Sequence, residues 1–530
     1  MLERNLLAPA IALAALFTAT SVLTAQPQST SPDREQDGRT VAATEAPTIS
    51  IDGKFEDWQR IRPVTRARTA AADEAPLRFQ EVRITHDHEF VYFFVDLGRP
   101  VNPQRLDGRM VLALDVDGDQ QTGRPIFGLR GGDLALEFTP ENTRNPGRPG
   151  MGMALRSATL EDGGRDGLSP YDLSFAFAPT HASRYVEMRL ERGVTLPGSP
   201  KTFDGDRLAG QFVLLDSEEN VLHHTPTFTY RLTSTEPTEI SFEDDPLKRA
   251  EGTDVRVMSW NAEHGSMIAN PGPFARILQA LDPDVVLWQE LTPRNSASQM
   301  AGFMNEHVPA GDGMEWRVVF GEGGGPLRCA IASRLPIRPV QAVETIPYPD
   351  RPDRQVRVAG AAITVGEKEL LVVSTHLKCC GGMDTREDRQ RLEEVQLINN
   401  AVRQALRAHD FGGVVIGGDL NLVGAREPKL VLGRGIAPDG SNLKTTDAYH
   451  LSGRMNATWS ERRSQFTPGR LDFLLFSEST LRAGRSFVLE TEEVPVKWLE
   501  KHGLLASDTT TATDHFPVVA DYIWQDPRRN

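Results

Sequence analysis

The sequence contains few cysteines: only Cys329, Cys379 and Cys380 among 530 residues. Three cysteines exclude a disulfide framework as the means of holding the fold together, and none has the spacing of a zinc site. Cys379 and Cys380 are neighbours, and a bridge between neighbours strains the backbone. Free thiols and a single pairing of Cys329 therefore both remain open.

An excess of basic charge is also absent. The chain has 58 Lys and Arg against 73 Asp and Glu, a net charge of −15. This balance argues against a protein that binds polyanions through bulk charge. No dense Lys/Arg run with interleaved aromatics marks a nucleic-acid groove, although an enzyme with local basic residues is not excluded.

No apolar stretch of the sequence is long enough for a typical membrane span. The uncharged segment from Leu6 to Val22 is short for a spanning helix of about 20 residues; Arg4 precedes it and Leu23-Thr24-Ala25 offers a cleavage site. We expect residues 1–25 to be a signal peptide, with an uncleaved anchor as the alternative. We also expect a disordered spacer at 26–45, no transmembrane segment in the mature chain, and a periplasmic or secreted protein.

The length of the chain predicts two or three domains. Residues 46–235 contain short apolar runs separated by Gly, Pro and Asp turns, with almost no helical periodicity. This pattern predicts an all-β sandwich domain. Residues 236–253 are polar and read as a linker to a second domain at 254–525.

The first domain resembles the family 9-like carbohydrate-binding modules in three places: Ile51-Asp52-Gly53 with Asp57-Trp58, the hairpin from His86-Asp87-His88 to Val91-Tyr92, and the Asp-rich turn 115–123. The resemblance implies an accessory domain that binds a glycan, although such sandwiches also serve as spacers. Trp58 and Tyr92 are candidates for stacking on a sugar, with burial in the core as the alternative. Asp115, Asp117 and Asp119 are candidate Ca²⁺ ligands, or alternatively the builders of a turn.

One pattern recurs in the second domain: a hydrophobic strand ends in a residue that suits metal or phosphate. Strand ends of an α/β sheet are where such folds collect their ligands. Six or more such residues indicate a site, because a single one is usually structural. They are Asn261, Glu290, His376, Asp419, Asn421, Asp472, Asp514 and His515.

The segments around these residues resemble the motifs of the endonuclease/exonuclease/phosphatase superfamily, in the same order along the chain. They are Trp260-Asn261, Gln289-Glu290, Thr375-His376-Leu377, Gly418-Asp419-Leu420-Asn421, Arg470-Leu471-Asp472-Phe473 and Thr513-Asp514-His515-Phe516-Pro517. The resemblance implies a four-layer α-β-β-α sandwich of the DNase-I-like fold, following the all-β domain. It also implies hydrolysis of phosphate esters that depends on Mg²⁺, with Mn²⁺ as a second candidate.

The resemblance also implies a role for each residue. Glu290 is the principal metal ligand, assisted by Asn261, and Asp514 adds a metal or water contact. Asp419 orients or deprotonates the attacking water, and Asn421 donates to the phosphate. His376 and His515 flank the phosphoryl oxygens, and Asp472 orients His515. Whether His515 is a base or a charged donor stays open.

We therefore expect an exported, Mg²⁺-dependent phosphoesterase of the phosphodiesterase or nuclease type, with nucleic acid as a candidate substrate. No Tyr stands near His376, where the abasic-site endonucleases of the superfamily carry one, so a repair enzyme is disfavoured. The alternatives are a phosphomonoesterase or inositol-phosphate phosphatase, and a sphingomyelinase-like phospholipase. A non-catalytic binding protein is a further alternative. Such a protein would be expected to lack Glu290, Asp419 or His515, and this sequence contains all three.

Overall fold

The computed structural model describes residues 49–66, 75–142, 150–160, 167–237, 242, 244–311 and 313–525. The expected signal peptide (1–25) and spacer (26–45) lie outside the described residues, as do residues 238–241 and 243 of the expected linker. Residues Gly38–Asn530 form one compact unit. In the described part of the chain, no helix is both long and apolar enough to cross a membrane.

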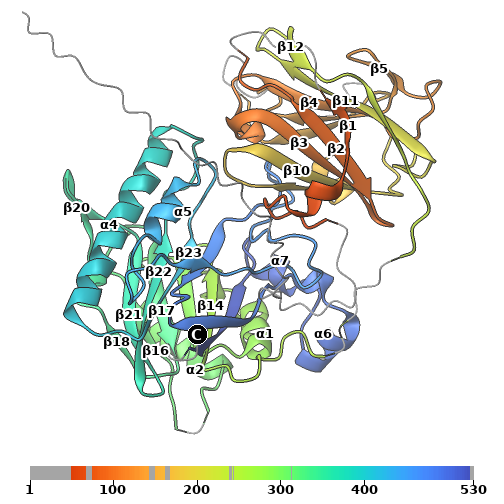
Figure 1. The fold of residues 1–530 in the computed structure, drawn as a ribbon. Helices are drawn as coiled ribbons and strands as arrows, with labels where there is room; N and C mark the ends of the chain where they lie inside the picture. The colour runs from red at the N-terminus through yellow and green to blue at the C-terminus, as the bar shows by residue number, and fades with distance from the viewer. Residues whose placement is uncertain are drawn as a thin grey trace, which may run out of the picture. The chain divides into compact units, whose positions relative to one another are not determined.

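The N-terminal part of this unit is built from two antiparallel sheets, as the alternating sequence pattern predicts (Figure 1). The first has the order β1-β2-β3-β10-β9; the second has the order β12-β11-β4-β7-β8, with β13 also paired to β11. The strands of the first sheet are β1 (Pro63–Arg66), β2 (Glu81–His86), β3 (Phe90–Val101), β9 (Ala176–Ala178) and β10 (Ser183–Glu191). Those of the second are β4 (Arg109–Asp115), β7 (Leu134–Phe138), β8 (Met153–Ser157), β11 (Arg207–Leu215), β12 (Val221–His224) and β13 (Phe228–Arg231). A small hairpin joins β5 (Arg124–Ile126) to β6 (Leu129–Gly132).

The core of the sandwich lies between the two sheets, where Phe93 from β3 and Leu112 from β4 are fully buried. The two aromatic residues considered for sugar stacking are also buried: Trp58 is 1% exposed and Tyr92 is 0% exposed. The indole of Trp58, in the short 3₁₀ helix η1 (Asp57–Arg60), donates to Glu187 at 2.7 Å. These two rings are core residues, and the stacking interpretation is wrong for both.

The Asp-rich turn after β4 brings three carboxylates together, but they are not the three that the spacing predicted. Ligand atoms of Asp115, Asp117 and Asp133 all lie within 4.8 Å of one another. Asp119 is outside this group, and its Oδ1 accepts a hydrogen bond from the backbone of Gln121 at 2.9 Å. Asp133 comes from the segment before β7, a neighbour that local spacing could not reveal.

The C-terminal part contains two six-stranded sheets of mixed strand direction. The first has the order β16-β17-β15-β14-β27-β26 and the second the order β18-β21-β22-β23-β25-β24. The first consists of β14 (Val255–Asn261), β15 (Val285–Leu291), β16 (Arg317–Phe320), β17 (Arg328–Ser333), β26 (Leu481–Val488) and β27 (Val518–Trp524). The second consists of β18 (Ile337–Pro339), β21 (Val358–Val365), β22 (Lys368–His376), β23 (Gly413–Asp419), β24 (Lys444–Thr445) and β25 (Asp472–Phe476). A short hairpin pairs β19 (Pro347–Tyr348) with β20 (Arg351–Gln355).

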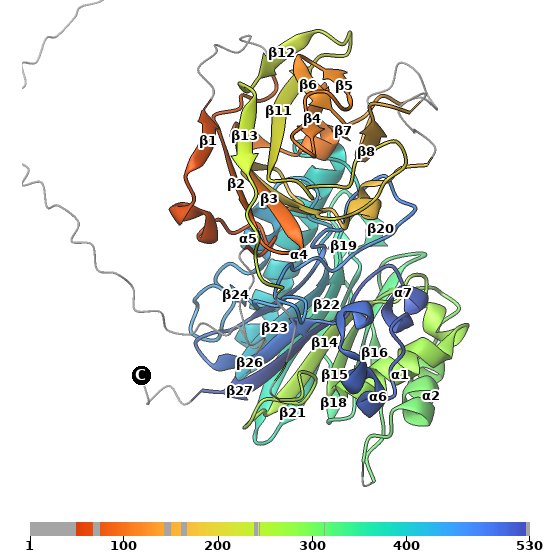
Figure 2. The same cartoon turned by 90° about the vertical axis from the view of Figure 1, so that its right-hand side faces the viewer.

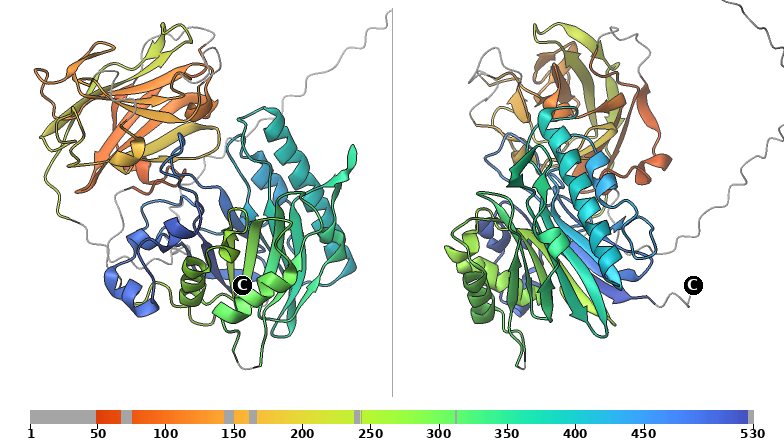
Figure 3. Two further views of the ribbon diagram at one scale, coloured as in Figure 1. Left: turned by 180° about the vertical axis from the view of Figure 1, so that it is seen from behind. Right: turned by 90° about the vertical axis from the view of Figure 1, so that its left-hand side faces the viewer.

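Helices cover the outer face of each sheet. Figure 2 shows α1, α2, α6 and α7 gathered beside the first sheet, and Figure 1 shows α4 and α5 against the second. Both views of Figure 3 place the strands between the green helices α1 and α2 and the cyan helix α4. The helices on the first sheet are α1 (Pro271–Leu281), α2 (Ala297–His307), α6 (Val496–His502) and α7 (Asp508–Ala512); those on the second are α3 (Gln341–Glu344), α4 (Arg386–Ala408) and α5 (Glu427–Leu432).

Three apolar cores hold these four layers together. One lies between the sheets and includes Leu287 and Val372; the outer two pack α1 and α2 on one sheet and α4 on the other. The C-terminal part is therefore the expected α-β-β-α sandwich, and the all-β sandwich precedes it. The exact domain boundaries, 46–235 and 254–525, stay a prediction.

The two parts also share a small core. Met455 and Ala457 of the C-terminal part pack in one buried cluster with Ile49, Trp58 and Phe94 of the N-terminal part. Backbone bonds join them as well, since the amide of Ile51 donates to the carbonyl of Arg454 at 2.8 Å. The N-terminal sandwich is thus tied to the C-terminal part by core contacts as well as by the linker.

Candidate active site

Strand register brings three of the predicted residues into one row of the second sheet. In the parallel pair β22–β23, His376 stands opposite Asp419; in the antiparallel pair β23–β25, Asp419 stands opposite Asp472. All three side chains are almost fully buried. Three separate sequence motifs therefore deliver their polar residues to adjacent strand ends, as the recurring pattern predicted.

The first sheet contributes Asn261 and Glu290 from the parallel pair β14–β15. Glu290 lies at an irregularity in β15, where the register against β17 shifts between Trp288 and Leu291. Its φ of +57° falls in the left-handed region that non-glycine residues rarely adopt. Such bulges re-aim side chains, and strained backbone clusters at functional sites. Here the bulge directs the carboxylate toward the row on the second sheet.

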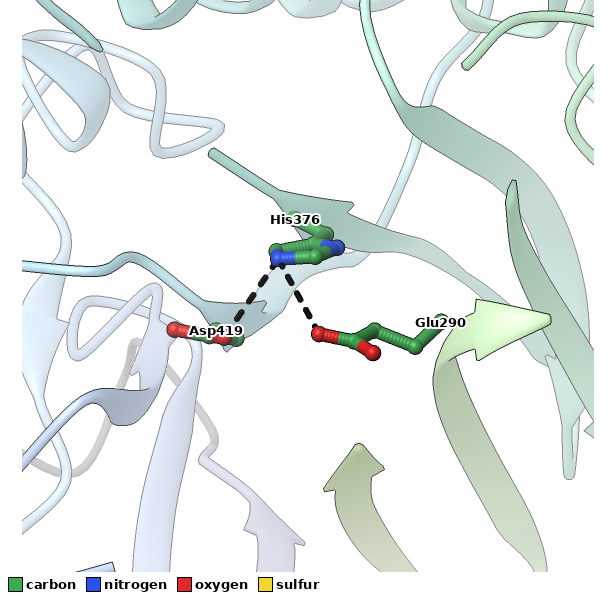
Figure 4. Close-up of side chains that lie close together, drawn as sticks. All are labelled: Glu290, His376 and Asp419. Atoms are coloured by element: carbon green, nitrogen blue, oxygen red, sulfur yellow. Dashed lines mark ion pairs between the residues drawn. The ribbon is translucent and has the colours of Figure 1, made fainter. Parts of the chain in front are cut away.

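Glu290, His376 and Asp419 form a compact group (Figure 4). The Nε2 atom of His376 lies 3.5 Å from Oδ2 of Asp419 and 3.7 Å from Oε1 of Glu290. One ligand atom from each residue lies within 4.8 Å of the others. Two carboxylates at this spacing, with an imidazole beside them, are an arrangement that can hold a divalent cation through its oxygens.

Asn261 holds this group together through its amide. Its Nδ2 donates to Oε1 of Glu290 and to Oδ2 of Asp419, both at 3.2 Å, while its Oδ1 accepts from the backbone of Glu263 at 3.0 Å. In this arrangement Asn261 is a donor to the carboxylates. Its predicted role as a metal ligand stays a prediction.

The electrostatics of the group fit a bound cation. Burial raises the pKa of Asp419 to about 8; the charges of Asp472 and Glu290 also raise it, against the lowering effect of His515. Burial, then the charges of Arg357 and His515, lower the pKa of His376 well below its ordinary value, so this imidazole is neutral. The buried carboxylate of Asp419 lies beside another carboxylate and a neutral imidazole. His515 supplies a nearby positive charge, and a divalent ion would supply more.

His515 and Asp472 form a hydrogen-bonded pair beside this group. Nδ1 of His515 donates to Oδ2 of Asp472 at 2.7 Å, and the hydroxyl of Thr458 donates to the same oxygen at 2.7 Å. Burial lowers the pKa of His515, but Asp472, Asp419 and Asp514 outweigh it and raise the pKa to about 10. The imidazolium form is therefore favoured at neutral pH, and Nε2 carries a proton beside the carboxylates.

The two remaining predicted residues lie at the same place. Asn421, with a φ of +47°, donates from Nδ2 to Oδ2 of Asp419 at 3.0 Å and so fixes that carboxylate. Oδ1 of Asp514 lies 3.9 Å from Nε2 of His515, and its Oδ2 accepts from the indole of Trp459 at 2.8 Å. All eight predicted residues are brought together, and their individual roles stay predictions.

Sequence reasoning missed three residues that support the site. Thr458 and Trp459 hold Asp472 and Asp514. Arg357 lies beside His376, with 3.3 Å between Nη1 and Nδ1. None of the three stands at a strand end, and loop residues show no periodicity. The only signal was the polar, aromatic composition of the segment around Trp459.

The thiols near the site are free, and Cys329 is buried under it. Cys379 and Cys380 follow His376 by three and four residues in a loop held by Arg391. Arg391 is fully buried and donates to the carbonyls of Lys378 and Cys380 at 2.9 and 2.7 Å. It supports the loop and also pairs with Asp388.

A cavity of about 320 Å³ opens over these residues. Its floor contains Glu290, His376, Asp419, Asp514 and His515. Its walls include apolar and aromatic residues of the C-terminal part and four residues of the N-terminal sandwich. These wall residues are Leu327, Trp459, Phe466 and Leu471, and Asn102, Gln104, Arg105 and Thr180.

Comparison with known proteins places this region in a family. Residues 258–515 match the model of the Endonuclease/Exonuclease/phosphatase family. No curated protein matches the chain.

Several solved structures are similar to about half of the chain. Truncated TDP2 from Caenorhabditis elegans has 19% identity and a TM-score of 0.35, covering 51% of this chain and 97% of its own. ANGEL2, a 2′,3′-cyclic phosphatase, has 14% identity and a TM-score of 0.35, covering 52% and 96%. The human Nocturnin catalytic domain with bound sulfate has 15% identity and a TM-score of 0.33, covering 51% and 93%.

The family match spans every predicted site residue, from Asn261 to His515. Six of the eight line one cavity, and the other two, Asn261 and Asp472, are hydrogen-bonded to residues of that cavity. Residues 258–515 of this chain therefore match the endonuclease/exonuclease/phosphatase family, and the match identifies this region as that of a hydrolase acting on phosphate ester bonds.

Proposed function

We propose that the protein is an exported phosphodiesterase that depends on Mg²⁺, with Mn²⁺ as a substitute, and cleaves its substrate by attack of water on phosphorus. One observation carries the proposal. Glu290, His376 and Asp419 converge at cation-binding spacing, and His515, held by Asp472, lines the same cavity beside them. Export rests on the apolar segment from Leu6 to Val22 and the small residues after it.

The donor set suits Mg²⁺ better than Zn²⁺. Mg²⁺ is held by one or two carboxylates and retains several waters, whereas zinc sites favour Cys and His. Glu290 and Asp419 are the two carboxylates of the group, with Asp514 as a further oxygen donor nearby. A bound divalent ion supplies positive charge that stabilises the negative charge developing on the phosphoryl oxygens.

The protein's own side chains position and activate the water. Asn261 and Asn421 both donate to Oδ2 of Asp419 and fix the direction of its carboxylate. In its ionised form Asp419 accepts a proton from the attacking water, so it acts as the general base. The neutral His376 donates its Nε2 proton, because Nδ1 faces the guanidinium of Arg357.

His515 acts as a charged donor in this proposal. Asp472 and Thr458 hold the ring in one orientation, with the proton of Nδ1 directed at Asp472. The remaining proton, on Nε2, is available for a phosphoryl oxygen or for the departing oxygen of the substrate. A preorganised charged donor of this kind stabilises a transition state more than it stabilises the ground state.

Two alternative substrates use the same floor. A phosphomonoester such as an inositol phosphate needs the same cation and water, and a phospholipid headgroup differs only in the group that leaves. Nucleic acid is favoured among the phosphodiesters because aromatic residues, Trp459 and Phe466, line the cavity and offer stacking surfaces for bases.

A substrate panel tests the proposal. The mature chain, residues 26–530, is assayed with Mg²⁺ on plasmid DNA, RNA, bis-p-nitrophenyl phosphate, an inositol phosphate and sphingomyelin. We expect hydrolysis of DNA, RNA and bis-p-nitrophenyl phosphate, with a rate at least about 10³-fold lower in the Glu290→Gln variant. Hydrolysis of the inositol phosphate alone would favour the phosphatase alternative, and hydrolysis of sphingomyelin alone the phospholipase alternative. Equal rates for the variant and the native protein contradict the assigned site.

We also propose a Ca²⁺ ion at Asp115, Asp117 and Asp133 of the sandwich. Ca²⁺ takes about six to eight oxygen ligands, and this group supplies carboxylates at suitable spacing. Asp133 is fully buried, and its Oδ1 has no hydrogen-bond partner in the described residues. Burial is the main cause that raises the pKa of Asp133 to about 7. We expect Ca²⁺ to raise the Tm of the EGTA-treated native protein but not that of Asp133→Asn.

A further inference from the structure

The N-terminal sandwich supplies part of the wall of the active-site cavity. Asn102 and Gln104 lie where β3 runs into the 3₁₀ helix η2 (Pro103–Arg105), and Arg105 is the last residue of that helix. All three line the same cavity as Glu290 and Asp419. A domain that served only as a spacer would not be expected to line the active-site cavity. The presence of these three residues there therefore suggests a role in binding the substrate.

Buried hydrogen bonds fix the wall in place. Nδ2 of Asn102 donates to the carbonyl of Val423 at 3.1 Å, two residues beyond Asn421. The amide group of Gln104 bonds reciprocally with Thr467: Nε2 donates to the Thr467 hydroxyl at 3.1 Å, and Oε1 accepts from its backbone at 3.3 Å. Both side chains are buried, so these bonds are costly to break. The wall therefore has a defined position relative to the catalytic residues.

Arg105 is the charged residue of this wall. Its guanidinium carbon lies 4.7 Å from the ring centre of Phe466, which backs one face of the group. Among the described residues, no carboxylate forms an ion pair with Arg105, and no acceptor receives a hydrogen bond from its guanidinium. Burial is the main cause that lowers its pKa, and the charge of Arg391 lowers it too, against the raising effect of Cys380, Cys379 and Glu387.

A half-buried guanidinium without an anionic partner is unfavourable, because it has lost part of its hydration without compensation. In a cavity that accepts phosphate esters, an anionic group of the substrate can provide that compensation. The planar fork of Arg matches two oxygens of a phosphate, and an aromatic ring behind the fork keeps it oriented.

We propose that Arg105 binds a second phosphate group of the substrate, so that the preferred substrate is a phosphate ester that carries another phosphate besides the one hydrolysed. The inference rests on the proposed function. It makes the sandwich a determinant of specificity: the C-terminal part performs the hydrolysis, and the sandwich selects which ester is held there.

The test compares two esters with the same scissile bond. Thymidine 5′-(p-nitrophenyl phosphate) carries a free 3′-hydroxyl, and its 3′-phosphorylated form carries the second phosphate. Both are assayed with the native protein, Arg105→Gln and Arg105→Lys. The matched control is Arg62→Gln, which removes the same charge from an exposed arginine of the sandwich that does not line the cavity. Thermal unfolding confirms that each variant folds.

We expect the native protein and Arg62→Gln to prefer the 3′-phosphorylated ester by about tenfold or more in kcat/KM, mainly through KM, as a charged hydrogen-bonded pair provides. Arg105→Gln loses this preference while keeping its kcat on the ester with the free hydroxyl. Arg105→Lys keeps part of the preference, because it retains the charge without the fork. An unchanged preference in Arg105→Gln, or no preference in the native protein, overturns the proposal.

A binding measurement separates this proposal from the proposed function. Calorimetry compares thymidine 3′,5′-bisphosphate with thymidine 5′-monophosphate on the native protein and on Arg105→Gln. If neither ester is hydrolysed, the proposed phosphodiesterase activity fails, but tighter binding of the bisphosphate by the native protein alone still supports Arg105. Equal binding of the two nucleotides by the native protein contradicts the role of Arg105 whether or not hydrolysis occurs.

Discussion

At the scale of single residues, Asp472 decides the charge of His515. Its Oδ2 accepts from Nδ1 of His515 at 2.7 Å, and its charge overcomes the effect of burial. The folded pKa of about 10 lies above the ordinary value of 6.5, so the imidazolium persists to about pH 10. Without the Asp472 carboxylate, the lowering effect of burial on the pKa of His515 is less strongly opposed, so His515 loses its proton at a lower pH.

The Asp472→Asn variant therefore has two expected effects on hydrolysis. We expect kcat to fall by about 10²–10³-fold, because a positioned charged donor is lost, and the alkaline limb of the pH–rate profile to move to lower pH. Thr458→Val is the comparison variant, since it removes the hydroxyl that donates to Asp472 and accepts from the amides of Leu471 and Asp472, but keeps the carboxylate. An alkaline limb that stays in place in Asp472→Asn contradicts the assigned role.

At the scale of elements, the pairing of β22 with β23 aligns His376 and Asp419. Gly418, directly before Asp419, has a φ of +144°, and a Cβ there would lie 1.8 Å from the carbonyl oxygen of Thr375. That carbonyl belongs to the neighbouring strand and cannot yield as a flexible side chain can. The glycine is thus required for the close approach of the two strands.

We expect Gly418→Ala to lower the free energy of unfolding by about 3 kcal/mol or more and to reduce hydrolysis, because the strands must separate to admit the methyl group. Gly272→Ala, in α1, is the control: its Cβ meets only the flexible end of Arg276, so stability is maintained or rises slightly. Chemical denaturation measures both values. A cost below about 1 kcal/mol for Gly418→Ala shows that the strand pair tolerates a side chain and that alignment does not depend on the glycine.

Much of the element level was predictable from the sequence. The spacing of Phe274, Ile277 and Leu281 predicts α1, the apolar face through Val395 and Val402 predicts α4, and both form. The polar strand ends meet because sheet register is set by hydrophobic alternation. The bulge at Glu290 and the loop residues Thr458 and Trp459 were not predictable, because they depend on contacts between distant segments.

At the scale of the whole molecule, the sandwich and the C-terminal part are joined by a shared core. Met455 packs with Trp58, and Gln104 bonds Thr467 across 363 positions of the sequence. Contacts between residues so far apart in the sequence cannot be recognised from local spacing. The sequence therefore indicated only an accessory domain, whereas in the structure this domain forms part of the cavity wall. Asp133 was missing from the predicted Ca²⁺ site for a more local reason, because it lies outside the Asp-rich turn, directly before β7.

The shared core predicts the way in which the protein unfolds. We expect calorimetry to show one cooperative transition for the mature chain, since loss of either part exposes the apolar surface of the other. Met455→Ser, which places a hydroxyl in the shared core, is expected to lower the Tm and to split the transition by weakening the junction. Two well-separated transitions in the native protein contradict a common core.

Glu290, His376 and Asp419 together are the proposed place of metal-assisted hydrolysis of a phosphate ester. The most direct measurement is the rate of bis-p-nitrophenyl phosphate hydrolysis by the native protein and by Asp419→Asn, first in EDTA and then with Mg²⁺ added back. We predict that EDTA abolishes the native activity, that Mg²⁺ restores it, and that Asp419→Asn stays at least about 10³-fold slower at every Mg²⁺ concentration. Native activity that persists in EDTA, or an Asp419→Asn variant that Mg²⁺ restores to the native rate, would contradict the account.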